Sequence, residues 1–280
     1  MIKLLAGVTI FFLVTATNFS SLSAHEPLFG FGPDTIRKGG YAIEGEFEYE
    51  RVGDERETEV AADIMYGVTE YLAVSATIPF IINKQEQENG KCEAFRSAGL
   101  GKLEARAKYR LYFDYQYGKR TQVVLIGGIR FPTVGLNKNP ALGNRTMDFI
   151  VSTAAGYETL QASYFGTITY TINTRGHGQQ EGNELNLTLS AGFRPEPISY
   201  YKLDWLFFLE FDLVHTAKAK IHRSKDNNSG GYVAFVGPIV FVSKENILFK
   251  AGIQAPMFEH VNGMQEKHDY RVAFGLDLHF

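Results

Sequence analysis

Two stretches of the chain carry charged residues at every second position, the spacing that places side chains on one face of a β-strand. Glutamates alternate with apolar residues in "YAIEGEFEYE" (41–50), and basic residues do so in "KLEARAKYRLYF" (102–113). Such rows could line a channel, attract or repel ions, and orient a charged solute. The acidic candidates are Glu44, Glu46, Glu48, Glu50, Glu59 and Asp63, and the basic candidates are Lys102, Arg106, Lys108, Arg110 and Arg130.

These two sets allow two interpretations. Acidic and basic rows on opposed walls of a lumen would produce a transverse field that orients a passing solute. The same side chains could instead meet as a network of ion pairs that fills the lumen. The size of the barrel does not decide between these interpretations. Barrels of about eight strands leave room for side chains only and barrels of roughly 16–18 strands leave an aqueous channel, and the strand number expected below lies between the two.

The stretch "GYVAFVGPIVFV" (231–242) is apolar on both faces, and Leu206 and Phe208 are expected to share the inward face of the strand before it. An apolar strip inside a lumen would suit a hydrophobic or aromatic solute. It could equally pack against residues 25–40, if that segment folds into the lumen as a plug.

Catalytic and metal-binding patterns are weak. The stretch "HGQQEGN" resembles the His-x-Ser and Asn arrangement of outer-membrane phospholipases. The position two residues after His177, where that arrangement needs a nucleophilic hydroxyl, is occupied by Gln179. Elsewhere the histidines lack ligand spacing. His25, if it became the N-terminus, would offer an amine and an imidazole to Cu(II), although Pro27 has no amide hydrogen. We expect no enzyme activity, no catalytic residue, no metal site and no cofactor.

The elements that must position these residues are strands. A side-chain period of two recurs along the chain without helical periodicity, and 28 glycines with 14% aromatic residues favour turns and strands. About 12 strands are expected, at 41–50, 58–67, 71–80, 102–113, 121–131, 147–157, 161–172, 183–194, 205–215, 231–242, 247–257 and 269–280.

Connection lengths sort into two classes. Links at 67–70, 114–120, 158–160, 195–204 and 243–246 are mostly compact, whereas polar links at 81–101, 132–146, 173–182, 216–230 and 258–268 are long. Short periplasmic turns and longer outer loops are typical of bacterial outer-membrane barrels. The sequence therefore predicts an all-β protein, a transmembrane antiparallel β-barrel of outer-membrane type at 41–280, preceded by a periplasmic segment or lumen plug at 25–40.

The two ends of the sequence agree with that location. Residues 1–24 combine a basic start, an apolar run and small polar residues, which is typical of a cleaved signal peptide. The alternation of the last strand continues to Phe280, which would place a ring in a periplasmic aromatic girdle and resembles the signal read by the outer-membrane assembly machinery. Cys92 is the single cysteine, so no internal disulfide can form.

The net charge of −3 argues against nucleic acid as a partner. The expected partners are the lipid bilayer, the assembly machinery and a small-molecule solute. We predict a channel or transporter for small solutes. The alternatives are a non-conducting structural barrel or, with less support, a lipid hydrolase or a metal-related transporter.

Several short motifs add a family resemblance. "FGPDTIRKGG" followed by an acidic strand, "MYGVTEYLAVSATIPF", "GLGKLEARAKYRL", "GGIRFPTVG" and "GIQAPMF" resemble a family of outer-membrane transporters named for the MetA pathway of phenol degradation. The resemblance implies a barrel of about this size and a transport role. It does not carry phenol over as the solute.

Overall fold

The computed structural model describes residues 26–87, 94–133, 140–143, 146–176, 178–196 and 202–280. The predicted signal peptide at 1–24 lies outside the described residues. So do three residues that were considered for metal binding, disulfide formation or catalysis, namely His25, Cys92 and His177.

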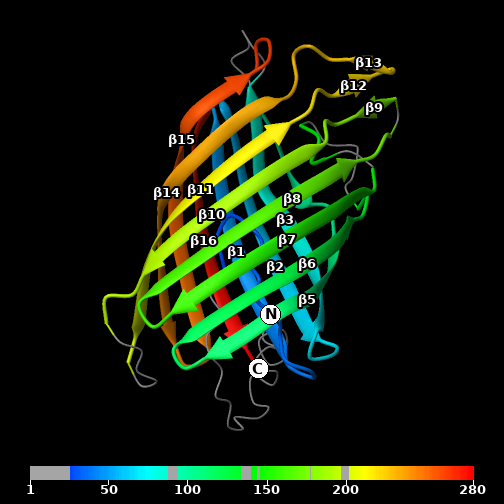
Figure 1. The fold of residues 1–280 in the computed structure, drawn as a ribbon. Coiled ribbons are helices and arrows are strands. Elements are labelled where there is room, and N and C mark those ends of the chain that lie inside the picture. Colours follow the sequence, from blue (N-terminus) through cyan, green and yellow to red (C-terminus); the bar gives the residue numbers. More distant parts are fainter. Residues whose placement is uncertain (1–25, 88–93, 134–139, 144–145, 177, 197–201) are drawn as a thin grey trace, which may run out of the picture.

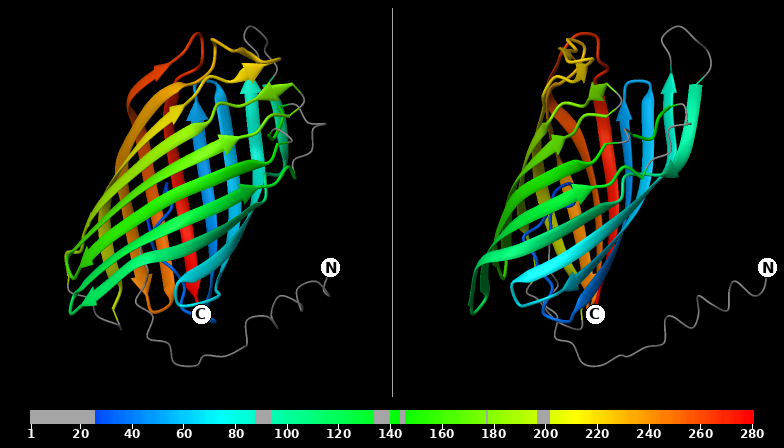
Figure 2. Two further views of the ribbon diagram at one scale, coloured as in Figure 1. Left: turned by 45° about the vertical axis from the view of Figure 1, so that its right-hand side comes forward. Right: turned by 90° about the vertical axis from the view of Figure 1, so that its right-hand side faces the viewer.

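Twelve antiparallel strands close into a barrel, because β1 pairs with both β16 and β2, and β2 pairs with β3 (Figures 1 and 2). No helix in the described part of the chain is long and apolar enough to cross a membrane. The barrel strands are β1 (Tyr41–Val52), β2 (Glu55–Gly67), β3 (Leu72–Gln87), β5 (Glu104–Gln116), β6 (Lys119–Arg130), β7 (Asp148–Thr159), β8 (Ala162–Asn173), β10 (Glu184–Phe193), β11 (Asp204–Thr216), β14 (Gly231–Lys244), β15 (Ile247–Val261) and β16 (His268–His279).

The predicted loop at 81–101 is wrong in part. Strand β3 continues to Gln87, and β4 (Ala94–Leu100) pairs with this extension as a hairpin that projects beyond the barrel wall (Figure 2). A hairpin outside the bilayer needs no lipid-facing apolar row, so hydrophobic alternation does not reveal it. Three short strands in the outer loops, β9 (Gln179–Gln180), β12 (Lys220–Ile221) and β13 (Ser224–Lys225), form a separate sheet.

The two faces of the barrel wall have opposite polarity. On β7 burial alternates residue by residue: Phe149 and Val151 are exposed on the outside, whereas Asp148 and Ser152 are buried on the inside. This is the inverse of a soluble protein, because apolar side chains on the outside meet lipid rather than water. The alternation predicted from the sequence therefore defines which residues face the lumen.

Aromatic rings mark the end of the barrel where the first and last strands meet. Tyr41 and Phe280 stack with their centroids 4.9 Å apart, and the Phe280 N–H donates to the Tyr41 carbonyl at 2.9 Å. Other exposed rings expected at this level are Tyr66, Tyr157, Phe193 and Trp205. Phe113, expected in the same row, lies instead on the inner face, because a bulge between Arg110 and Tyr112 makes it the partner of the inward Gln122. Exposed rings at a barrel end are typical of the membrane–water boundary, and short turns identify this end as periplasmic.

The barrel lumen as a candidate functional site

Residues 26–40, here called the lumenal segment, fold back from the start of β1 into the barrel (Figure 2). The turn at its base depends on glycine. Gly39 has φ of +77° and donates its N–H to the Gly67 carbonyl at 2.8 Å. A Cβ atom on Gly67 would lie 1.9 Å from the Arg37 carbonyl oxygen, so only glycine permits this close approach of the two backbones.

Basic residues of the wall hold one side of the lumenal segment. The Lys108 ammonium on β5 donates to the Glu26 carboxylate at 2.7 Å and to the Gly32 carbonyl at 3.2 Å. On β6, the Arg120 guanidinium pairs with Asp34 at 3.0 Å. Both cations are largely buried, and the segment supplies the oxygens that replace water around them.

An acidic residue of the opposite wall holds the other side. The Glu210 carboxylate on β11 is fully buried and accepts hydrogen bonds from two backbone amides, those of Leu28 at 3.2 Å and Phe29 at 2.9 Å. The Arg271 guanidinium on β16 lies over the Phe29 ring, 4.5 Å from its centroid. A cation in this position is attracted by the negative face of the aromatic ring.

The apolar strip predicted inside the lumen packs against Leu28, whose side chain is only 4% exposed. This contact is the second of the two roles considered for the strip, packing against the N-terminal segment. The pairing of β14 with β15 shifts by one residue between Ala234 and Phe235, where Met257 of β15 has no partner on β14. The buried wall residues around Leu28 are Phe165, Leu206, Phe208, Ile239, Phe241, Leu248 and Ala273.

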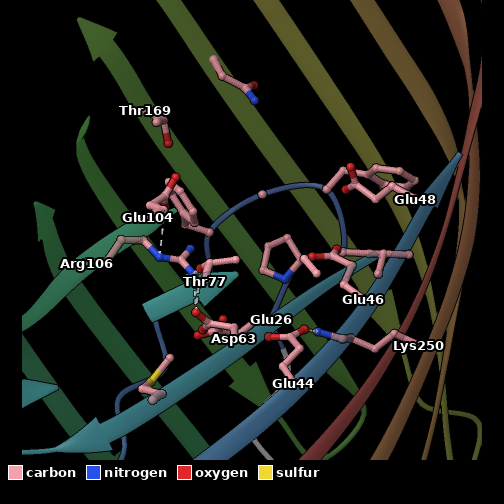
Figure 3. A pocket seen from close by; sticks show the side chains of 18 of the residues that line it. Glu26, Glu44, Glu46, Glu48, Asp63, Thr77, Glu104, Arg106, Thr169 and Lys250 are labelled. Atoms are coloured by element: carbon pink, nitrogen blue, oxygen red, sulfur yellow. Dashed lines mark hydrogen bonds and ion pairs between the residues drawn. The ribbon is translucent and has the colours of Figure 1, made fainter. Parts of the chain in front are cut away.

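A cavity of 280 Å³ remains in the lumen beside the lumenal segment, which contributes Glu26 and residues 27–31 to its lining (Figure 3). The wall of the cavity is mainly acidic. Its carboxylates, apart from Glu26, are Glu44, Glu46, Glu48, Glu59, Asp63, Glu104 and Glu184, and its cations are Arg106, Lys108 and Lys250.

Seven of the predicted lumen residues line this cavity: Glu44, Glu46, Glu48, Glu59, Asp63, Arg106 and Lys108. The other four predicted residues, Glu50, Lys102, Arg110 and Arg130, do not line it. Among these, Lys102 pairs with Asp148 at 2.5 Å, Arg130 pairs with Glu104 at 2.7 Å, and Arg110 donates to the Thr35 hydroxyl.

The cavity also contains charged residues that sequence reasoning did not select. Lys250 on β15 pairs with Glu44, as Figure 3 shows, and lies 3.2 Å from Asp277. Lys250 is the single charged residue in the stretch "ILFKAGI" (247–253). The alternation of this strand places it on the inward face, and this position is the signal that could have identified it as a lumen residue. Glu184, at the outer end of β10, carried the same signal.

The acidic and basic rows are neighbours rather than opposed walls, because only β3 separates the acidic strands β1 and β2 from the basic strand β5. Arg106 therefore reaches Asp63 at 3.0 Å and Glu104 at 3.2 Å. The described residues show no ion pair for Glu46 or Glu59. The lumen thus combines an ion-pair network with carboxylates that form no ion pair among the described residues.

The part of the chain that the structure describes holds no group of three or more His, Cys, Asp or Glu side chains placed to bind a metal ion. The carboxylates of the cavity are spread over several strands. The carboxylates can attract cations and repel anions. The basic residue Lys108 forms a salt bridge with Glu26 of the lumenal segment.

Comparison with known structures places the fold among outer-membrane barrels. The protein is similar to an outer-membrane channel from Pseudomonas putida F1, with a TM-score of 0.68 and 9% identity over 89% of this chain and 98% of that one. It also matches LpxR from Salmonella typhimurium over 86% of this chain and 100% of that one, with 9% identity and a TM-score of 0.49, which is too low to carry an argument.

No protein-family model and no curated protein sequence matches the chain. The family named for the MetA pathway therefore stays a prediction from short motifs. The similarity to the channel shows the fold, and the closed barrel with its apolar outer face places the protein in the bacterial outer membrane, where the lipid bilayer surrounds it.

Proposed function

We propose that this protein is an outer-membrane channel for small solutes and that the lumenal segment closes it at rest. One observation carries the proposal: the segment lies inside the lumen and is held by side chains from both sides of the wall, by Lys108 and Arg120 on one side and by Glu210 on the other. The shared fold with an outer-membrane channel supports it.

The contacts that hold the segment suit reversible closure. They are non-covalent, and each contributes modestly, because ion pairs and hydrogen bonds exchange with water when they break. The segment continues into β1 only through Gly39 and Gly40, and the left-handed conformation of Gly39 supplies the turn. Movement about this turn would empty the lumen without breaking a barrel strand.

The class of solute follows from the surfaces that this movement would expose. The apolar strip around Phe208 and Phe241 would face a lumen whose remaining wall is charged. A small solute with a hydrophobic or aromatic part and a polar part suits both surfaces. The motif resemblance to the transporter family named for the MetA pathway adds to this proposal, which includes no catalytic role.

Planar bilayers test the proposal. Purified full-length protein should show small and infrequent openings, whereas a variant that lacks residues 26–36 but keeps the turn at 37–40 should conduct steadily and more. Resistance of unheated samples to denaturation on a gel controls for folding of both proteins. If both are folded and both are silent, the barrel is structural; release of lipid products by either protein would instead indicate a hydrolase.

A further inference from the structure

The small outer sheet carries an unusual concentration of positive charge. The stretch "AKAKIHRSK" (217–225) contains Lys218, Lys220, Arg223 and Lys225 and no carboxylate. Residues 220–225, which form the β12–β13 hairpin, are all exposed. The hairpin lies at the outer end of the barrel, beyond the ends of β10 and β11 (Figure 1).

The hairpin places two like charges directly opposite each other. Lys220 on β12 is the cross-strand partner of Lys225 on β13. Like charges in this position are unfavourable by themselves. The described carboxylates form no ion pair with Lys220, Arg223 or Lys225. Asp226, the next acidic residue along the chain, accepts a hydrogen bond from the Asn228 amide.

The backbone holds these cations in a defined arrangement. His222 and Arg223 form the tight turn with φ of 49° and 74°, left-handed values of the kind that a two-residue hairpin turn requires. Lys220 also pairs with Gln180 of β9 in the neighbouring loop, and the His222 N–H donates to the Gly178 carbonyl at 2.8 Å. The cross-strand repulsion is therefore built into an ordered element.

The position of the hairpin relates it to the lipid surface. It comes after β11 in the chain, at the outer end of the wall where Glu184 of β10 pairs with Thr216 of β11. At the same level Tyr170 is 42% exposed on the outside of β8, and its hydroxyl accepts a hydrogen bond from the Asn183 side chain at 3.0 Å. Exposed tyrosines mark the membrane–water boundary, so the basic hairpin rises from the level at which lipid headgroups begin.

We propose that the β12–β13 hairpin docks on the phosphate groups of the phosphorylated glycolipid in the outer leaflet, the lipopolysaccharide. Charge complementarity carries this assignment: Lys220, Arg223 and Lys225 supply a compact cationic surface, and anionic headgroups would remove the repulsion between the two lysines. The interaction lies on the outside of the barrel and goes beyond the proposed channel function.

Binding of fluorescent bis-phosphorylated lipid A to the detergent-purified full chain, followed by anisotropy at low salt, tests the proposal. The test variant replaces Lys220, Arg223 and Lys225 with Gln. The matched control replaces three exposed lysines at the periplasmic end, Lys119, Lys202 and Lys244, with Gln. Because a cation near an anionic surface contributes roughly fivefold to affinity, we expect about a 100-fold loss for the hairpin variant and less than about threefold for the control.

Further arms identify the source of the phosphate. Dephosphorylated lipid A should bind weakly and equally to all three proteins, and millimolar inorganic phosphate should not displace the labelled lipid. Equal affinity of the hairpin variant and the control variant would overturn the proposal. Undiminished binding of the dephosphorylated lipid would do the same, and so would displacement by inorganic phosphate, since that would indicate a site for the free anion.

Discussion

Replacing Leu28 with Ala should open the channel without disturbing the barrel. Leu28 is 4% exposed and belongs to one buried apolar cluster with Phe208, Ile239 and Phe241 of the wall. In an undocked segment this side chain would meet water, and so would the apolar wall residues that it covers. The substitution therefore weakens docking while leaving every strand pair in place.

The size of the effect follows from apolar burial. Full burial of a leucine side chain contributes roughly 1.5–3 kcal/mol, and truncation to alanine removes most of this contribution. A loss of about 2 kcal/mol changes the ratio of docked to undocked segment by about 30-fold. Since the amides of Leu28 and Phe29 keep their bonds to Glu210, we take this value as the contribution of the apolar contact alone.

Single-channel recording in planar bilayers measures this ratio as open probability. We expect the Leu28→Ala variant to be open about 30 times more often than the wild type while both are mostly closed. Lys38→Ala is the matched control, because Lys38 lies in the same segment but is exposed. An unchanged open probability in a folded Leu28→Ala variant would refute the idea that apolar docking of this segment closes the lumen.

Three further predictions concern the turn, the barrel seam and the cavity. Gly67→Ala should displace the Arg37 carbonyl, which would lie 1.9 Å from the new methyl group, and speed trypsin cleavage of the segment several-fold; an unchanged cleavage rate would contradict this. Deletion of Phe280 should lower the amount of folded protein in the outer membrane more than Phe193→Ala, which removes another exposed ring at the same end, because the deletion also removes hydrogen bonds to Tyr41. In the Leu28→Ala background, removing negative charge should reduce cation preference, read as a smaller reversal potential across a KCl gradient. The carboxylates to replace with Gln are Glu46, Glu48 and Glu59.

The barrel was predictable because the bilayer imposes a simple rule on every spanning strand. Alternation identifies the outward Tyr109 and Leu111 on β5, which are exposed, and the inward Lys108, which is 3% exposed. Alternation alone also places Phe113 outside, but a bulge between Arg110 and Tyr112 pairs Phe113 with the inward Gln122 and so turns it to the lumenal face. The rule does not apply outside the membrane, and for this reason β4 was missed. Its residues meet water on both sides, so no period of two is required of their polarity.

The partners within the lumen were not predictable from the same rule. Alternation says that Lys108 and Glu210 point inward, but strand tilt and the path of the lumenal segment decide what they meet. Glu26 precedes Lys108 by 82 positions, and Leu28 precedes Glu210 by 182. No local pattern specifies contacts at such separations. Glycine at Gly67 was visible in the sequence as a turn residue, but its close approach to Arg37 was not.

The distribution of these contacts has a consequence for the order of assembly. The lumenal segment bonds to β5 through Glu26, to β8 through the Phe31 carbonyl, and to β11 through the amide of Leu28. It precedes all three strands in the chain, so its binding site is complete only after most of the wall has formed. Contacts between distant parts of a chain form slowly. We therefore expect the lumen of a nascent barrel to stay unfilled until a late stage of assembly. The lumenal segment can dock only after the strands that bind it have joined the barrel.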